Sequence, residues 1–138
     1  METIELIALA KKTMENAYVP YSHFRVGAAL LTDKDEVYTG CNIENASFGG
    51  TNCAERTALF KAISEGKRKF KAVAIISDSN DYTYPCGICR QVFSEFGLDI
   101  DIIVAKNNGE YRVHKLREIL PFAFTNEELE RGKVNEQI

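Results

Sequence analysis

The sequence predicts an α/β fold, a three-layer α-β-α sandwich around a central mixed sheet of five strands. Helical and strand-like segments alternate along the chain, which favours a sheet between layers of helices. The strand-like runs at residues 72–77 and 99–105 are apolar enough to be buried on both faces. A chain of 138 residues has the length of one compact domain and shows no repeat or linker, so we expect a single domain over residues 1–138.

The first part of the chain predicts a helix followed by a hairpin. The helix is expected over residues 3–17, with Thr3 as a candidate N-cap, because apolar side chains recur on one face. Residues 24–31 and 36–41 have the composition of two strands, joined by a polar turn. Residues 42–52 show no periodic pattern and are expected to be irregular.

The rest of the chain alternates between the two kinds of element. Helices are expected at residues 53–65, 86–96 and 116–120, and strands at residues 72–77, 99–105 and 111–114. Gly66 and Gly97 follow the first two of these helices, where glycine commonly ends a helix. Thr125 and Glu128 form a capping box that predicts the start of a last helix.

Composition and charge exclude several classes of partner. The net charge is −3 and both signs are mixed along the chain, which argues against a nucleic acid polymer as partner. No apolar run approaches the roughly 18 residues of a membrane span, and the first twelve residues are amphipathic, unlike a signal peptide. We therefore expect a cytoplasmic protein with no membrane partner. In that reducing compartment, four cysteines favour metal ligands, catalytic groups or buried thiols over disulfides.

Two short motifs carry the candidate chemistry: CAE at residues 53–55 and PCGIC at residues 85–89. Each lies at the expected start of a helix, where the positive end of the helix dipole favours a thiolate. Cys86 and Cys89 are three residues apart and share one helical face. Glu55, in the first helical turn, can reach over the helix end toward Cys53. We therefore expect Cys53, Cys86 and Cys89 to share a metal ion with Glu55 beside it.

Three cysteine ligands indicate one catalytic zinc ion per subunit, because the fourth tetrahedral position stays free for a water molecule. Zinc makes that water more acidic, and a neighbouring carboxylate can take its proton. This arrangement matches the pattern described for zinc deaminases, in which the glutamate is not a ligand. His23 and His114, the two histidines of the chain, stand in no comparable motif and are expected to be non-ligands.

Four ordered motifs give the chain a close resemblance to a known family. They are PYSHFRVGAAL at residues 20–30, GCNIENAS at 40–47, CAER at 53–56 and PCGICRQ at 85–91. Over nearly its whole length the chain resembles the small homotetrameric, zinc-dependent cytidine deaminases. The resemblance implies zinc ligation by Cys53, Cys86 and Cys89, and proton transfer by Glu55.

The resemblance also implies a nucleoside site. The residues that it places there are Phe24, Asn42, Glu44, Asn45, Phe48, Ala54 and Phe124. Phe24 packs near the pyrimidine, Asn42 and Glu44 hold the ribose hydroxyls, and the backbone of Ala54 contacts the base. Phe124 enters from a neighbouring subunit, so that a homotetramer completes each active site.

Arg56 is expected to support the metal site from outside the ligand set. Three thiolates on a divalent ion leave a formal charge of about −1, which makes the bound water less acidic. Arg56 follows Glu55 directly and is the candidate to offset that charge. The family resemblance points to the same residue, through hydrogen bonds to the ligand sulfurs.

The predicted function is hydrolytic deamination of free cytidine, and of 2′-deoxycytidine, to uridine or deoxyuridine and ammonia in pyrimidine salvage. One alternative is a deaminase of a cytosine-containing antibiotic such as blasticidin S, which shares the CAE and PCGxCRQ motifs. Asn42, Glu44 and Phe124 favour ordinary nucleosides. From other classes, the alternatives are a non-catalytic structural zinc protein with Cys41 as fourth ligand and a redox pair formed by Cys86 and Cys89.

Overall fold

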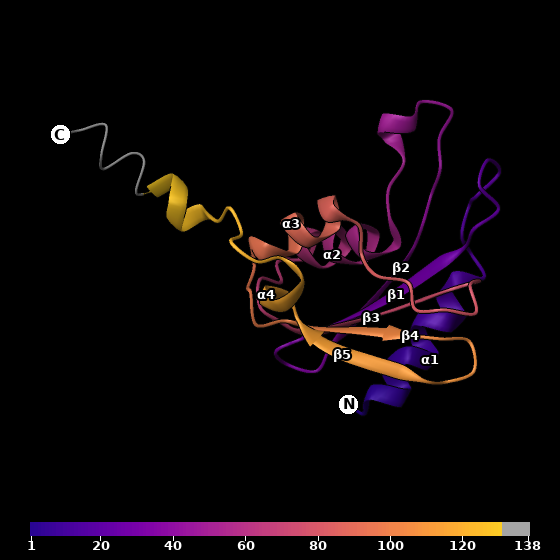
Figure 1. The fold of residues 1–138 in the computed structure, drawn as a ribbon, viewed down its shortest axis with the longest axis horizontal. Coiled ribbons are helices and arrows are strands. Elements are labelled where there is room, and N and C mark those ends of the chain that lie inside the picture. The colour runs from indigo at the N-terminus through magenta and orange to yellow at the C-terminus, as the bar shows by residue number, and fades with distance from the viewer. Residues whose placement is uncertain (131–138) are drawn as a thin grey trace.

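A mixed sheet of five strands forms the centre of the computed structural model, which describes residues 1–130 (Figure 1). The strands are β1 (Val26–Thr32), β2 (Val37–Cys41), β3 (Phe70–Ser77), β4 (Asp101–Ala105) and β5 (Tyr111–Lys115). They lie in the order β2-β1-β3-β4-β5. β3 and β4 are parallel, and the other neighbouring pairs are antiparallel. This confirms the predicted mixed sheet.

Helices cover both faces of the sheet. They are α1 (Thr3–Met14), α2 (Ala54–Ser64), α3 (Gly87–Ser94) and α4 (Leu116–Ile119), with a 3₁₀ turn, η1, at Phe48–Gly50. Figure 1 shows α1 on one side of the sheet and α2 and α3 on the other. The three layers therefore match the predicted α-β-α sandwich.

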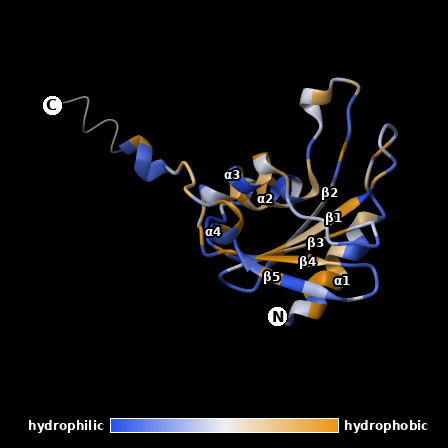
Figure 2. Cartoon of the chain, viewed as in Figure 1, coloured by the Kyte–Doolittle hydropathy of each residue, from blue (hydrophilic) through white to orange (hydrophobic). Residues whose placement is uncertain are grey.

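Alternate residues of the central strands supply two separate cores. In β1, Ala29 and Leu31 pack toward α1, whereas Ala28 and Leu30 pack toward α2. All four are buried, because helices lie on both sides of the strand. In Figure 2 the apolar colour follows the inner strands, and polar colour dominates the outer surfaces. The apolar runs of the sequence are thus explained by burial on both faces.

The ends of most elements differ from the sequence prediction by one to three residues, and the first helix shows the reason at both of its ends. Glu2, not Thr3, is the N-cap of α1, and Thr3 is its first helical residue, so the predicted cap is wrong. The α-helix ends at Met14 because the amides of residues 15, 16 and 17 bond to carbonyls three residues back and tighten the last turn.

The end of the described chain agrees with the predicted last helix. Residues 126–130 are helical, and the amide of Glu128 donates to the carbonyl of Thr125. Residues 131–138, which the single domain expected over 1–138 includes, lie outside the described residues. Across residues 1–130, no helix combines the length and the apolar character needed to cross a bilayer.

Two glycines let helices pack closely against the hairpin. A Cβ atom on Gly27 would lie 2.1 Å from the carbonyl oxygen of Ala10 in α1. A Cβ atom on Gly40 would lie 2.5 Å from the backbone nitrogen of Ala58 in α2. Since both obstacles are backbone atoms, neither can move without shifting a helix.

We expect Gly27→Ala to lower the free energy of unfolding by about 1–3 kcal/mol, the usual cost of overpacking. Urea denaturation followed by circular dichroism measures this change. Gly49→Ala is the matched control, because a Cβ atom at Gly49 meets no atom within 4 Å. Equal stability of the two variants would contradict the close packing of α1 on β1.

Candidate active site

Three cysteine sulfurs meet where α2 and α3 begin. Cys53 is the N-cap of α2, Cys86 is the N-cap of α3, and Cys89 lies in the first turn of α3. Their sulfur atoms all lie within 4.8 Å of one another, and those of Cys53 and Cys86 are 3.8 Å apart. Zn–S bonds of roughly 2.3 Å in a tetrahedron place two sulfurs about 3.8 Å apart. The spacing therefore fits a tetrahedral zinc ion.

Hydrogen bonds hold the start of α3 in this position. The amide of Cys89 donates to the sulfur of Cys86 at 3.5 Å. The guanidinium of Arg90 donates to the carbonyl oxygens of Pro85 and Ile119, both at 2.8 Å, and so ties this turn to α4. The position of the PCGIC motif thus depends on contacts outside the motif.

Protons are unevenly shared among the sulfurs. A hydrogen bond from the Cys89 thiol lowers the pKa of Cys53 to about 5, with help from Arg56. The same bond, together with burial, raises the pKa of Cys89. A metal ion displaces such thiol protons, because thiolates are the form that binds. The group therefore already contains one favourable thiolate.

Arg56 supplies positive charge to the sulfurs. One amino nitrogen of its guanidinium donates to the sulfur of Cys53 at 3.3 Å. Its Nε atom is buried with no hydrogen-bond partner among residues 1–130. Burying a guanidinium is costly unless negative charge lies close by. A set of three thiolates supplies that charge, so the surroundings of Arg56 also fit a metal held by all three cysteines.

Glu55 is a buried carboxyl group, with 4% of the residue exposed. Burial raises its pKa to about 7, and the negative charge of Cys53 acts in the same direction. A carboxyl group in this range exchanges protons readily at neutral pH. Glu55 lies in the first turn of α2, two positions after the N-cap residue Cys53, and both residues line the same cavity.

A cavity of about 210 Å³ opens beside Glu55. Its lining comes from the start of β1, the end of β2, the start of α2 and the loop before α3. The lining residues are Phe24, Val26, Asn42, Cys53, Ala54, Glu55, Thr83, Tyr84 and Cys86. Six of the residues predicted from the sequence therefore line one cavity together.

Asn42 and Glu44 fasten the segment before β1 to the loop after β2. The Asn42 side chain accepts from the amide of Val26 at 2.9 Å and donates to the carbonyl of Phe24 at 2.8 Å. Glu44 accepts from the amides of Tyr21 and Ser22 and from the Ser22 hydroxyl. The Ser22 hydroxyl lowers the pKa of Glu44, so this carboxylate stays ionised.

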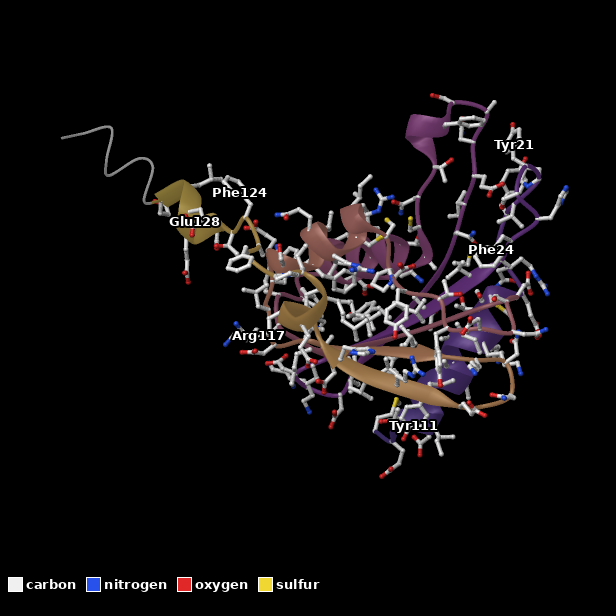
Figure 3. The ribbon with its side chains drawn as sticks, in the orientation of Figure 1. Tyr21, Phe24, Tyr111, Arg117, Phe124 and Glu128 are labelled. Carbon is white, nitrogen blue, oxygen red and sulfur yellow. The ribbon has the colours of Figure 1, made fainter. Side chains whose placement is uncertain are left out.

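Four predicted substrate residues, which are Glu44, Asn45, Phe48 and Phe124, do not line the cavity. Asn45 and Phe48 are exposed on the loop that rises above α2 in Figure 1, and Phe48 packs edge-on against Tyr21. Phe124 is 59% exposed, and Gln91 donates to its carbonyl at 2.6 Å. Figure 3 shows Phe124 and Phe24 far apart along the molecule.

Comparison with known proteins identifies the family of this site. Residues 1–106 match the family model described as the cytidine and deoxycytidylate deaminase zinc-binding region. The chain belongs to the cytidine and deoxycytidylate deaminase family. The cofactor of this family's zinc-binding region is zinc, and the group formed by Cys53, Cys86 and Cys89 could hold it.

Individual members agree with this assignment over nearly the whole chain. A cytidine deaminase of Sporosarcina psychrophila is 48% identical over 130 residues, covering 94% of this chain and 96% of the relative. The crystal structure of a cytidine deaminase from Burkholderia pseudomallei has a TM-score of 0.87 and 46% identity, covering 90% of this chain and 100% of the other. A blasticidin-S deaminase of Bacillus cereus is 28% identical over 132 residues, covering 90% of this chain and 93% of the relative. The similarity to cytidine deaminases is thus the stronger one.

Sequence reasoning missed several residues at this deaminase site. Val26, Thr83 and Tyr84 line the cavity, and Ser22 holds Glu44. Thr83 and Tyr84 directly precede the PCGIC motif. Their position next to two predicted zinc ligands could have indicated that they line the site. The bond between Ser22 and Glu44 joins residues 22 positions apart, so no local pattern indicated it.

We expect Arg56→Gln to shift the pH–rate profile of deamination to higher pH with zinc retained. Removing a positive charge beside the sulfurs makes every group in the site hold its proton to a higher pH. Activity measured across pH, with zinc content determined in parallel, checks this expectation. Arg117→Gln, which changes an exposed arginine paired with Asp99, is the matched control. An unchanged profile for Arg56→Gln would count against the role of Arg56.

Proposed function

We propose that the protein is a zinc-dependent cytidine deaminase that hydrolyses the 4-amino group of free cytidine, giving uridine and ammonia. One observation carries this conclusion: the buried carboxyl group of Glu55 lines one cavity together with Cys53 and Cys86, two members of the three-cysteine group. We extend the proposal to 2′-deoxycytidine as a second substrate, and to the salvage of free pyrimidine nucleosides in the cytoplasm.

The cysteines and Glu55 divide the work of the reaction. Cys53, Cys86 and Cys89 would hold the zinc ion, which when bound supplies a Lewis acid that makes water nucleophilic near neutral pH. Glu55 takes a proton from the attacking water and passes it to N3 of cytosine. It then takes the remaining proton of the hydroxyl added at C4 and delivers it to the 4-amino group. The C4–N bond breaks as the C4 carbonyl of uridine forms, and the amine leaves as ammonia. In the metal-free protein, burial raises the pKa of Glu55 to about 7.

The nucleoside would lie between the two sides of the cavity. Phe24 and the backbone of Ala54 border the space beside Glu55, where the base must sit for proton transfer. Asn42 and Glu44 would bind the ribose hydroxyls, since amide and carboxylate oxygens accept hydrogen bonds. Both side chains already bond to the backbone at residues 21–26, so the ribose site is held in place before substrate arrives.

We further propose a homotetramer whose subunits complete one another's sites. The support is the position of Phe124, which is largely exposed and outside the cavity of its own chain. Phe122, two residues earlier, is also fully exposed. A second copy of the chain would bury these aromatic rings and bring Phe124 to a neighbouring cavity, while Asn45 and Phe48 would border the entrance.

A mixing experiment tests the composite site. Glu55→Gln lacks the proton shuttle but keeps Phe124, and Phe124→Ala has the opposite defect. When the two variants are mixed, unfolded and refolded together, hybrid tetramers contain sites with both residues, so activity should exceed the sum of the separately refolded samples. Activity equal to that sum would show that each chain completes its own site.

An absorbance assay with cytidine tests the function itself. We expect the purified protein to convert cytidine to uridine, to lose this activity when zinc is removed by a chelator, and to regain it when zinc is added. Blasticidin S and 2′-deoxycytidine are assayed alongside. Faster turnover of blasticidin S than of cytidine would favour the antibiotic deaminase, and absence of any turnover by the zinc-loaded protein would favour a structural zinc protein.

A further inference from the structure

The loop before α3 forms one wall of the cavity, and β5 holds it. Thr83 and Tyr84 line the cavity directly ahead of Pro85 and Cys86. The Tyr84 hydroxyl lies 3.1 Å from Nε2 of His114 in β5. The two rings are 5.5 Å apart, centre to centre, and tilted by 51°. Both residues are half-buried, so this contact fixes the Tyr84 ring.

The register of the sheet explains why His114 reaches the cavity wall. His114 lies opposite Ile102 of β4, whose side chain belongs to the core under α2 and α3. Arg112, two residues earlier, points to the same face and lies over the ring of Tyr82, 4.3 Å from its centre. β5 thus continues this face of the sheet with two polar side chains. His114 contacts Tyr84, and Arg112 interacts with the side chains of both Tyr82 and Tyr84.

Two apolar side chains would fill the space between the loop and β5 equally well if only packing were required, whereas Tyr84 and His114 also carry polar groups that must be satisfied. Two partly buried polar groups are favourable only while each satisfies the other, so the pair permits one ring position and penalises others. A wall side chain that is still mobile in the free protein must be ordered when the substrate binds, and that ordering weakens the affinity. A cavity wall with one allowed position is therefore useful at an active site.

We propose that His114 is a positioning residue for the nucleobase, acting through its hydrogen bond to the hydroxyl of Tyr84. The pair holds the Tyr84 ring as a fixed wall against which the base of the substrate rests. This inference rests on the proposed deaminase function, and it concerns residues outside the metal group and the proton shuttle.

The proposal separates substrate binding from the chemical step. Tyr84→Phe and His114→Ala each break the bond, so each should raise KM for cytidine about five- to tenfold and weaken uridine binding equally, with kcat within about twofold of the wild type. The double variant should match Tyr84→Phe, because loss of the hydroxyl already removes its bond to His114. His114→Gln, whose side-chain amide can still bond to the hydroxyl, should restore much of the affinity.

The measurements are steady-state kinetics with cytidine, calorimetric binding of uridine, zinc content and melting temperature. Val113→Ala is the matched control, because Val113 is an exposed neighbour on the opposite face of β5. Tyr84→Phe keeps the aromatic ring and removes only the hydroxyl. It therefore tests the role of the hydrogen bond even if His114→Ala fails to fold.

Three results would overturn the inference. The first is an unchanged KM in Tyr84→Phe. The second is additive effects in the double variant. The third is a fall in kcat and zinc content at constant KM, which would mean that the pair supports Cys86 instead of the base. Each of these leaves wild-type turnover of cytidine intact, whereas a failure of the proposed function removes that turnover itself.

Discussion

Glu55→Gln should retain zinc and lose nearly all turnover of cytidine. Glutamine keeps the shape of glutamate and leaves the three sulfurs unchanged, but it cannot accept the proton of water or pass it to the base. General acid–base catalysis contributes roughly 10²–10⁴ in rate, and here one group serves both halves of the reaction, so we expect a loss of about 10³-fold or more in kcat. The cytidine absorbance assay and metal analysis measure the two quantities.

Stability provides the control for this variant. Burial raises the pKa of Glu55 from 4.5 to about 7, so the folded metal-free protein keeps a proton that the unfolded chain loses over this range. The contribution of Glu55 to stability therefore falls as pH rises from 4.5 through 7. Glutamine does not ionise, so the metal-free variant should melt at or above the temperature of the metal-free wild type at pH 8.

A surface variant completes the comparison. Glu65→Gln, at the exposed end of the same helix, should keep full activity. Turnover by Glu55→Gln at even a tenth of the wild-type rate would contradict the shuttle role of Glu55.

Cys89→Ala should abolish both zinc binding and deaminase activity. Cys89 is fully buried and its sulfur lies close to the other two, so its loss leaves two thiols, too few for a stable tetrahedral site. Metal analysis of the purified variant should find far less than one zinc ion per chain, and the melting temperature should fall toward that of the chelated wild type.

Cys41→Ala is the matched cysteine control. Cys41 lies at the end of β2, outside the group of three sulfurs, and burial raises its pKa, which disfavours the thiolate that zinc needs. We expect the variant to keep its zinc and its activity. Loss of zinc from Cys41→Ala would instead support the four-cysteine structural site.

The sequence predicted the fold well wherever burial determines the pattern. β1 and β3 are buried on both faces, so their apolar runs appeared directly in the sequence. The end of α1 was less predictable, because its last turn tightens through backbone bonds that side chains do not specify. Thr3 was assigned as a cap from residue type alone, but the backbone leaves the helix at Glu2.

The site divides in the same way. Cys53, Glu55, Cys86 and Cys89 could be found because each group of ligands lies within one turn of a helix start, where spacing determines geometry. The contact between Tyr84 and His114 joins residues 30 positions apart and depends on the register of β5 with β4. Such a contact exists only after the sheet has formed, so no local sequence motif could have predicted it.

A zinc ion bound at the three sulfurs would connect two helices, because the N-caps of α2 and α3 are both among its ligands. Cys53 belongs to α2 and Cys86 to α3, so an ion bound to both is a cross-link between segments 33 residues apart. Metal binding to such a group also stabilises the folded state. The zinc-free chain lacks this cross-link, so it should melt at a lower temperature than the zinc-loaded protein.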